Sequence, residues 1–168
     1  RKAGALLVVL LLLQQAVLIQ ALTHRAIGST TTKLAEARPG WSSYPNPNTF
    51  FVSVDVPTDR SVRWSLVLRY RLYISWCIGA EAVRASIYLS NGFSHSIEVY
   101  LPITGGSEDT GIVTRSWTGV SRGVSSLGFY GYVYAEASGW SGSAYALAEM
   151  IKITLKACLL YTSDAADD

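Results

Sequence analysis

Three of the five tryptophans stand among serine and glycine residues, a composition that predicts loops. Trp41 lies in Gly-Trp-Ser, Trp117 in Ser-Trp-Thr-Gly and Trp140 in Gly-Trp-Ser-Gly. A loop tryptophan presents a flat apolar ring and one N–H donor, which suit stacking on a sugar ring or anchoring a protein contact. The favoured interpretation is that these rings close the ends of a hydrophobic core, because large aromatic residues often do so. We take all three as candidate ligand-binding residues.

One pair of adjacent carboxylates, Glu108 and Asp109, follows Gly105-Gly106-Ser107 and offers oxygen atoms to a calcium ion. Calcium takes roughly six to eight oxygen ligands, and two carboxylates supply too few of them. A solvated turn is therefore the favoured interpretation of this segment. The sequence predicts no cofactor, with calcium at this pair as the weak candidate.

Catalytic motifs give little support for an enzyme. No HExxH zinc motif and no glycine-rich phosphate loop occurs, and His24 and His95 are the only histidines. A glycosidase needs two carboxylates that face one cleft, and Glu136 and Glu149 are the only pair that the expected register of the last hairpin brings near each other. We expect a protein without catalytic residues, with a fragment of a glycan-active enzyme as an alternative.

An apolar segment, residues 3–22, follows the basic pair Arg1-Lys2. A positive start, an apolar run and the small residue Ala21 are typical of a secretory signal peptide. The run is also about long enough to span a bilayer, so a retained anchor is the alternative over residues 1–25. A pilin-like helix in a filament core is a third interpretation. The first two predict an exported protein, extracellular or at the cell surface, with membrane contact only through this segment.

Residues 158–168, Cys-Leu-Leu-Tyr-Thr-Ser-Asp-Ala-Ala-Asp-Asp, resemble the in-frame translation of a sequencing adapter at the end of a metagenomic contig. We expect a non-native tail there and exclude it from the fold. Without its three aspartates, 14 basic residues stand against 9 acidic ones, a formal net charge of +5. This charge is well short of a nucleic-acid binder's, so nucleic acid is not an expected partner. Cys77 remains as a lone cysteine, which excludes an internal disulfide.

The remaining chain divides into a polar segment and one domain. Residues 26–48 are rich in serine, threonine, proline and asparagine, and they predict a linker or irregular lead-in. Residues 49–157 alternate between apolar and polar positions and predict an all-β antiparallel sandwich of about seven strands. The expected strands are Phe50–Val56, Arg63–Ile78, Val83–Leu89, Phe93–Leu101, Ile112–Trp117 and a last pair between Leu127 and Lys156.

The longest expected strand has apolar residues at every even position from Trp64 to Ile78. Polar residues fall between them, so one face is expected to be buried and the other wetted. Arg69 and Arg71 share the wetted face. A solvated or ion-paired ladder is the default interpretation of these arginines, and a patch for an anionic partner is the alternative.

The segment Ser90-Asn91-Gly92 predicts a hairpin with a three-residue loop and a left-handed Gly92. Only an odd loop puts Leu89 opposite Phe93 and keeps both apolar sets on one face, since opposed residues share a face. The same register sets Arg84 opposite Glu98, a favourable pair that was not assumed. It also turns His95 inward, as a hydrogen-bonded histidine of the core or its rim.

A last hairpin is expected from Leu127 to Lys156. Tyr130, Tyr132 and Tyr134 alternate on one arm, and Ala144, Ala146 and Ala148 alternate on the other. Large residues opposite small ones would pack well. Ile151, Ile153 and Leu155 would complete an apolar face.

The segments Gly128–Glu136 and Ala144–Leu155 resemble the closing strand pair of secreted jelly-roll modules of the carbohydrate-binding or lectin-like kind, over residues 127–156. The resemblance implies a jelly-roll sandwich that binds a ligand outside the cell. Glu149-Met150 stands where many such modules have Asp or Asn, a departure from their calcium or sugar sites. We expect a module for binding or adhesion whose partner is an extracellular glycan or a cell-surface protein. A structural subunit of a filament or surface layer is the alternative from another class.

Overall fold

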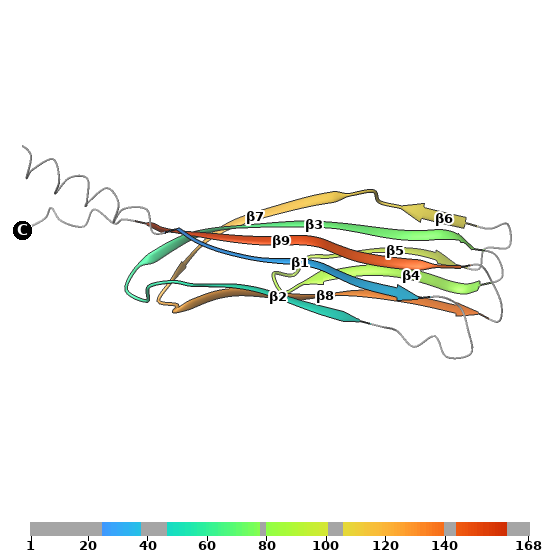
Figure 1. Ribbon diagram of the computed structural model, residues 1–168, viewed down its shortest axis with the longest axis horizontal. Coiled ribbons are helices and arrows are strands. Elements are labelled where there is room, and N and C mark those ends of the chain that lie inside the picture. The colour runs from blue at the N-terminus through green and yellow to red at the C-terminus, as the bar shows by residue number, and fades with distance from the viewer. Residues whose placement is uncertain (1–24, 38–46, 78–79, 101–105, 140–143, 161–168) are drawn as a thin grey trace, which may run out of the picture.

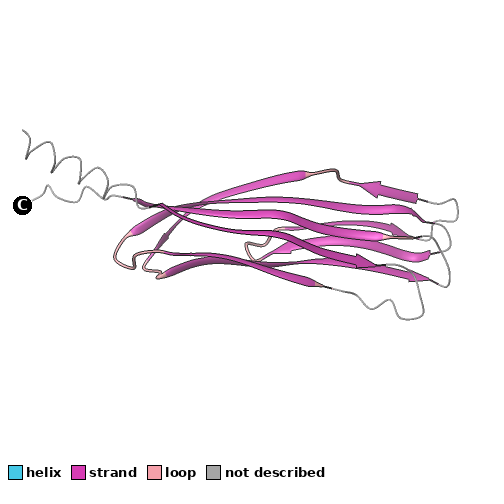
Figure 2. Ribbon diagram, in the orientation of Figure 1, coloured by secondary structure: helices cyan, strands magenta, loops and turns pink. Residues whose placement is uncertain are grey.

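The computed structural model describes residues 25–37, 47–77, 80–100, 106–139 and 144–160. These ranges form strands and no helix, in two antiparallel sheets of an elongated sandwich (Figures 1 and 2). The nine strands are β1 (Arg25–Ala37), β2 (Asn48–Asp55), β3 (Ser61–Cys77), β4 (Ala80–Leu89), β5 (Ser94–Tyr100), β6 (Gly106–Asp109), β7 (Val113–Arg122), β8 (Ser126–Gly139) and β9 (Ala146–Leu160). The all-β prediction is confirmed, with two strands more than expected.

Sheet A has the order β1-β9-β3-β6, with β7 also paired to β3, and sheet B has the order β2-β8-β4-β5. The core lies between the sheets and is built by alternation, because successive side chains of a strand point to opposite faces. Even-numbered residues of β3 from Leu66 to Ile74 are fully buried, as are odd-numbered residues of β4 from Val83 to Leu89. Each buried aliphatic side chain stabilises the fold by about 1.5–3 kcal/mol.

Most strand pairs are arranged symmetrically about one turn, so that each strand before the turn pairs with a strand at a similar distance after it. In the pairs β1–β9, β2–β8, β3–β6, β3–β7 and β4–β5, the numbers of opposite residues add up to between 181 and 183. The chain is therefore one long antiparallel ribbon whose two arms meet near Asn91. Folding of this ribbon brings β3 beside β9 and β4 beside β8, which completes the two sheets.

The turn at the tip of the ribbon has the predicted form. Gly92 has φ +89°, and the backbone N–H of Leu89 donates to the carbonyl of Phe93 at 2.9 Å. Arg84 lies opposite Glu98, and its Nη2 donates to Oε1 of Glu98 at 2.7 Å. The three-residue loop and its register are confirmed.

The polar lead-in predicted over residues 26–48 is wrong for its first part, because Arg25–Ala37 forms β1 and pairs along β9. Ala35 and Ala37 are buried, while one serine and three threonines, Ser29 to Thr32, form the middle of the strand. An edge strand needs few apolar residues, and threonine favours strands. Residues 38–46 lie outside the described ranges.

The apolar helix expected near the start falls on residues 1–24, which the structure does not describe. Within the described ranges no helix is long and apolar enough to cross a membrane. The expected non-native tail begins inside a strand, since β9 runs to Leu160, and the rest of that tail is not described.

The predicted hairpin between Leu127 and Lys156 is wrong. β8 lies in sheet B and β9 in sheet A, so these strands face each other across the core instead of pairing. Ala146 and Ala148 are fully buried, whereas Tyr130 and Tyr132 lie on the outer surface of sheet B. Because the two strands belong to different sheets, the tyrosines do not lie opposite the alanines as predicted.

A bulge in β9 shifts its alternation. Arg69 of β3 lies opposite Lys152 but Tyr70 lies opposite Met150, which leaves Ile151 as an extra residue. Met150 and Ile153 are both buried. Ile151 therefore does not belong to the inward set, contrary to the prediction, and Lys152 points outward.

Candidate functional site

Trp117 was predicted both as a loop residue and as the last residue of the strand Ile112–Trp117, and it lies inside β7, which continues to Arg122. It lies within β7 opposite Leu66, is half-buried, and packs its ring 5.2 Å from that of Phe93. Serine and threonine around it occupy outward positions of a strand instead of a turn. Trp117 closes one side of the sandwich, while Trp41 and Trp140 lie outside the described residues.

Glu108 and Asp109 belong to strand β6 and not to the predicted solvated turn. Arg71 donates to both oxygens of Asp109, from Nε to Oδ1 at 3.0 Å and from Nη2 to Oδ2 at 2.6 Å. The backbone N–H of Gly111 also donates to Oδ1, at 2.8 Å. These bonds, with Arg71 foremost, lower the pKa of Asp109. Both oxygens are thus engaged, and the described residues hold no group of three metal-binding side chains.

Glu136 and Glu149 lie on opposite outer surfaces, so they are not the pair that the predicted hairpin implied. Glu136 stands between the buried Ala135 and Ala137 of β8 and points out from sheet B. Glu149 lies opposite Arg71 in sheet A. Two carboxylates on opposite sides of a sandwich cannot face one cleft.

The spacing GxSxG, which sequence analysis overlooked, occurs at residues 119–123. A hydrolase needs this serine on a sharp turn between a strand and a helix. Ser121 instead lies inside β7, paired with Val62 of β3. The match therefore lies in a regular strand and does not form such a turn.

His95 points inward as predicted. The hydroxyl of Tyr70, a fully buried residue, lies 2.7 Å from Nδ1 of His95. Burial raises the pKa of Tyr70. The histidine satisfies a buried hydroxyl at the rim of the core.

The outer surface of sheet B carries a cluster of five aromatic side chains, which we call the aromatic face: Phe51 of β2, Tyr88 of β4, and Tyr130, Tyr132 and Tyr134 of β8. Their strand neighbours point into the core, so alternation turns these rings outward. Phe51 is 57% exposed and Tyr130 is 61% exposed. The odd-numbered residues Phe129, Val133, Ala135 and Ala137 form the inner set of β8, which leaves the even-numbered tyrosines on this surface.

Register places the five rings in adjacent rows. Phe51 lies opposite Tyr130, and Tyr132 lies opposite Tyr88. The rings of Tyr88 and Tyr132 stack with centroids 5.2 Å apart and planes 23° apart. Neighbouring strands are about 4.8 Å apart and rows about 7 Å, so the aromatic face extends over roughly 10 by 14 Å. These dimensions suit a ligand of a few sugar rings.

Two glycines of β8 allow the rings to lie close to the sheet. A Cβ at Gly128 would be 2.8 Å from Cζ of Phe51, so the Phe51 ring covers this position. A Cβ at Gly131 would collide with the carbonyl of Tyr88 and the ring of Phe50. Only a hydrogen fits at Gly131, whereas Gly128 leaves the space that the movable Phe51 ring occupies.

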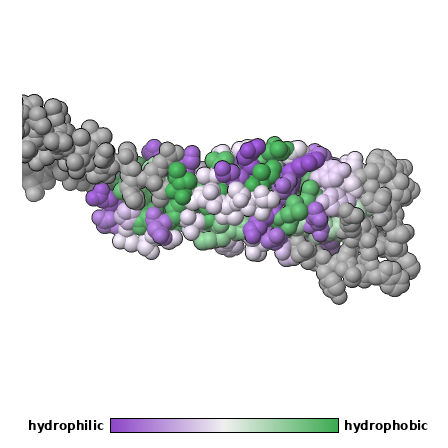
Figure 3. Space-filling model, in the orientation of Figure 1, coloured by the Kyte–Doolittle hydropathy of each residue, from purple (hydrophilic) through white to green (hydrophobic). Residues whose placement is uncertain are grey.

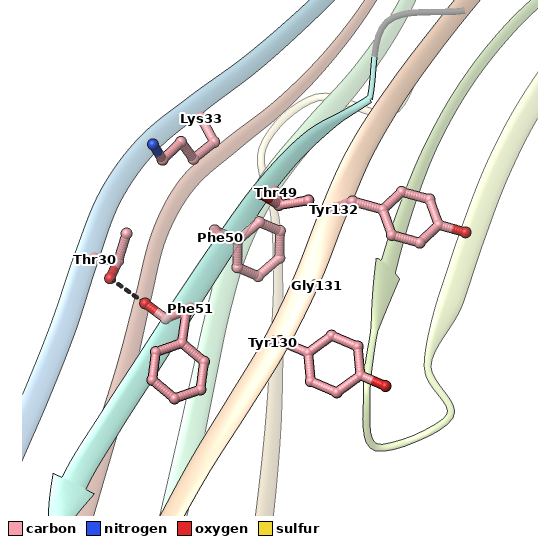
Figure 4. Close-up of a pocket in the computed structure, with 8 residues that line it drawn as sticks. All are labelled: Thr30, Lys33, Thr49, Phe50, Phe51, Tyr130, Gly131 and Tyr132. Atoms are coloured by element: carbon pink, nitrogen blue, oxygen red, sulfur yellow. Dashed lines mark hydrogen bonds between the residues drawn. The ribbon is translucent and has the colours of Figure 1, made fainter.

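An open hollow of about 630 Å³ lies along one edge of the aromatic face (Figure 4). Rings of Phe51 and Tyr130 stand side by side there, and Oγ1 of Thr30 donates to the carbonyl of Phe51 at 2.6 Å. This bond ties β1 of sheet A to β2 of sheet B. The lining residues are Thr30, Lys33, Thr49, Phe50, Phe51, Tyr130, Gly131 and Tyr132.

A second hollow of about 320 Å³ lies on the other side of the Tyr132 ring. It is more polar, and its lining residues are Arg84, Ser86, Ile87, Tyr88, Ser94, Ser96, Tyr132 and Tyr134. Oγ of Ser96 donates to Oγ of Ser86 at 2.9 Å. The hydroxyl of Tyr134 donates to Glu136 at 2.8 Å, and burial, then this bond, raises the pKa of Tyr134. Hydroxyls and a guanidinium are thus held beside the aromatic rings.

No protein-family model matches the chain, and no curated protein matches it. Among solved structures, that of infectious bursal disease virus Gx strain has 11% identity and a TM-score of 0.28, covering 84% of this chain and 38% of that chain. The enzymatically active domain of bacteriophage CBA120 tailspike protein 4 has 13% identity and a TM-score of 0.24, covering 81% and 19%. TmCBM61 in complex with beta-1,4-galactotriose has 12% identity and a TM-score of 0.20, covering 79% and 88%. The chain spans less than two thirds of the length of the first two structures.

Proposed function

We propose that this chain is a non-catalytic glycan-binding module that acts outside the cell or at its surface. The observation that carries the proposal is the aromatic face, where exposed Phe51 and Tyr130 adjoin the stacked pair Tyr88–Tyr132. The apolar segment after Arg1-Lys2 supports export.

The chemistry of the aromatic face fits a sugar. A pyranose ring has an apolar C–H surface that packs against a flat aromatic ring, and its hydroxyls need polar partners at the edge. Tyr130, Tyr132 and Tyr88 supply rings, while Ser86 and Ser96 supply hydroxyls in the adjoining hollow. Apolar rings gathered on a surface mark binding sites more often than single exposed residues do.

Topology supports a jelly roll as the form of the sandwich. A jelly roll is a double-sheet fold that occurs in lectin domains and capsid proteins. A jelly roll arises when one long antiparallel ribbon rolls up into two sheets. The strand pairs of this chain are nested around one turn, with β1-β9-β3 in one sheet and β2-β8-β4-β5 in the other, which is the arrangement expected of such a ribbon.

A non-catalytic role is supported by the state of the two glutamates on this surface. Glu136 accepts a hydrogen bond from Tyr134, and Glu98 forms an ion pair with Arg84. Glycoside hydrolysis needs one carboxyl group that gives a proton and a second that attacks the sugar or activates water. Carboxylates that are already hydrogen-bonded or ion-paired beside a flat surface are better suited to binding a sugar than to transferring a proton or attacking it.

The test is a glycan-array screen followed by calorimetric titration of the best ligand. Tyr132→Ala should weaken binding about tenfold, the effect of losing one stacking contact. Tyr73→Ala is the matched control, because Tyr73 lies in sheet A and packs against Tyr145. A screen without a ligand, or equal affinity of Tyr132→Ala and the parent chain, would overturn the proposal.

A further inference from the structure

Besides Arg71, which is paired with Asp109, four cationic side chains lie on the outer surface of sheet A, on the two strands at its centre: Arg63 and Arg69 of β3, and Lys152 and Lys156 of β9. We infer that this surface, the basic face, binds an anionic polysaccharide. It lies on the opposite side of the sandwich from the aromatic face and does not depend on the function proposed for that face.

Alternation directs all four side chains outward. Leu68 and Tyr70 flank Arg69 and are fully buried, as is Leu155 beside Lys156. Residues before and after a strand position point to the opposite surface. Lys152 belongs to this set because of the bulge at Ile151. The extra residue shifts the alternation of β9, so that the side chain of Lys152 points outward directly opposite Arg69.

Arg69 and Lys152 therefore form a direct cross-strand pair of like charges. Such a pair destabilises a sheet, in contrast to the opposite charges found at Arg84 and Glu98 on sheet B. An anion placed between the two cations would remove this repulsion. The basic face thus gains more from a bound anion than a surface with mixed charges would.

No carboxylate in the part of the chain that the structure describes forms an ion pair with the four cations of the basic face. Among the described residues, the ion pairs join Arg60 to Asp59, Arg71 to Asp109 and Arg84 to Glu98, and none involves the four cations. Asp109 is held by Arg71 on both oxygens, and Glu149 lies opposite Arg71 as well. Acidic groups of sheet A are thus gathered at the Arg71 end.

The spacing of the cations favours a polymer over a small anion. Lys152 and Lys156 are four residues apart on one strand, roughly 13 Å at about 3.3 Å per residue. Ser65 lies opposite Lys156, with Arg63 two residues before it. A single phosphate or carboxylate can reach one end only, while an extended chain with repeated charges spans Arg69–Lys152 and Arg63–Lys156 together.

Hydroxyl groups around the cations favour a polysaccharide over a lipid surface. Thr31 lies opposite Lys152, and Thr114 lies opposite Arg69. The hydroxyl residues of the face are Thr31, Ser65, Thr114, Ser116, Thr118 and Thr154. Their O–H groups can donate to and accept from sugar hydroxyls. The exposed apolar side chains beside the cations, Ile27 opposite Lys156 and Val120 opposite Arg63, lie apart on β1 and β7, with β9 and β3 between them. Insertion into a membrane relies on a continuous apolar face beside the cations.

The experiment measures binding of the full chain to polygalacturonate and dextran sulfate, with neutral dextran as reference, by biolayer interferometry at low and high salt. Binding to both charged polymers, absent for dextran and weakened by salt, is expected since exposed ion pairs are screened. Arg69→Gln/Lys152→Gln should weaken it about tenfold, the effect of roughly two exposed ion pairs. Arg60→Gln/Arg115→Gln removes equal charge elsewhere and should retain binding.

Three results would overturn the inference. The first is equal binding by the Arg69→Gln/Lys152→Gln variant and the parent chain. The second is loss of polymer binding in Tyr132→Ala, which would assign the polymer to the aromatic face. The third is stronger binding to phosphatidylserine vesicles or duplex DNA than to either polysaccharide. A thermal melt shows that each variant is folded.

Discussion

The rings of Tyr88 and Tyr132 stack 5.2 Å apart on the outside of sheet B, where they contribute little to the core. A cross-strand aromatic pair stabilises a sheet by roughly 0.2–1 kcal/mol. We expect Tyr88→Ala to lower the free energy of unfolding by no more than this, and yet to weaken glycan binding about tenfold. Urea denaturation and calorimetric titration of the same samples separate the two effects. A large loss of stability without a loss of affinity would contradict the assignment of this pair to a binding face.

Gly128 and Gly131 differ in what a methyl group would meet. Gly131→Ala should destabilise the fold by about 1–3 kcal/mol, since its Cβ meets the carbonyl of Tyr88 and a buried ring. Gly128→Ala meets only the far end of the exposed Phe51 ring, which can swing away. We therefore expect near-parental stability but weaker glycan binding for Gly128→Ala. Thermal melts and binding isotherms provide the comparison, and equal destabilisation by both substitutions is the outcome that argues against this picture.

Substitutions in the turn at Asn91 should show how much the positive φ of Gly92 contributes to stability. Gly92 has φ +89° and open space around its Cβ position, so the cost of a side chain there comes from the backbone alone. Gly92→Val should cost about 1–3 kcal/mol, because a β-branched residue resists positive φ. Asn91→Ala removes one hydrogen bond, from the N–H of Phe93 to Oδ1 of Asn91, and should cost about 1 kcal/mol or less. Chemical denaturation ranks the variants, and the reverse order would contradict the left-handed glycine.

The Arg71–Asp109 ion pair predicts a small dependence of stability on acid. The folded state lowers the pKa of Asp109 below its ordinary value of 3.8, so the stabilisation is complete above that value and is lost as pH falls through the lowered pKa. The pair is partly exposed, at 38% and 39%, which limits the effect to less than about 1 kcal/mol. Asp109→Asn should remove this part of the acid dependence, and Glu108→Gln, with the same change in charge, should not. Thermal melts between pH 2 and pH 6 provide the measurement. The same pH dependence of melting temperature in Asp109→Asn and in the parent chain would contradict a role of the ion pair.

Lys152→Glu should convert a repulsive pair into an attractive one. The carboxylate introduced at this position would face Arg69, and cross-strand pairs of opposite charge contribute roughly 0.2–1 kcal/mol. We expect higher thermal stability at low salt together with loss of binding to polygalacturonate. Lys156→Glu is the comparison, because Lys156 faces Ser65 and has no like charge directly opposite. A fall in stability on Lys152→Glu would contradict the register through the bulge.

Hydropathy alone does not reveal the two proposed binding surfaces. On the side shown in Figure 3, hydrophobic residues lie in separate groups between hydrophilic ones. The aromatic face is recognised because its tyrosine and phenylalanine side chains are exposed and lie opposite one another on neighbouring strands. A map of contacts between strands is needed to show that Phe51, Tyr130 and Tyr88 adjoin, because they come from three strands.

Local patterns of the sequence determined the strands of β3 and β4, the turn at Asn91 and the pairing of Arg84 with Glu98. Alternation is set by the geometry of a single strand, and a short turn fixes the register of its two neighbours, so both can be recognised without the rest of the chain. The inward direction of His95 followed from that register.

Only the tertiary structure decided which sheet each later strand joins. Both alternate sets of β8 are rich in apolar or aromatic residues, so alternation could not say whether the tyrosines face water or the core. The answer depends on how the ribbon folds, which places β8 beside β2 and β4 and sends β9 to the other sheet. The same distant contacts made Arg25–Ala37 a strand and put Trp117 inside one. Such contacts arise from burial between segments far apart in the sequence, and no local pattern encodes them.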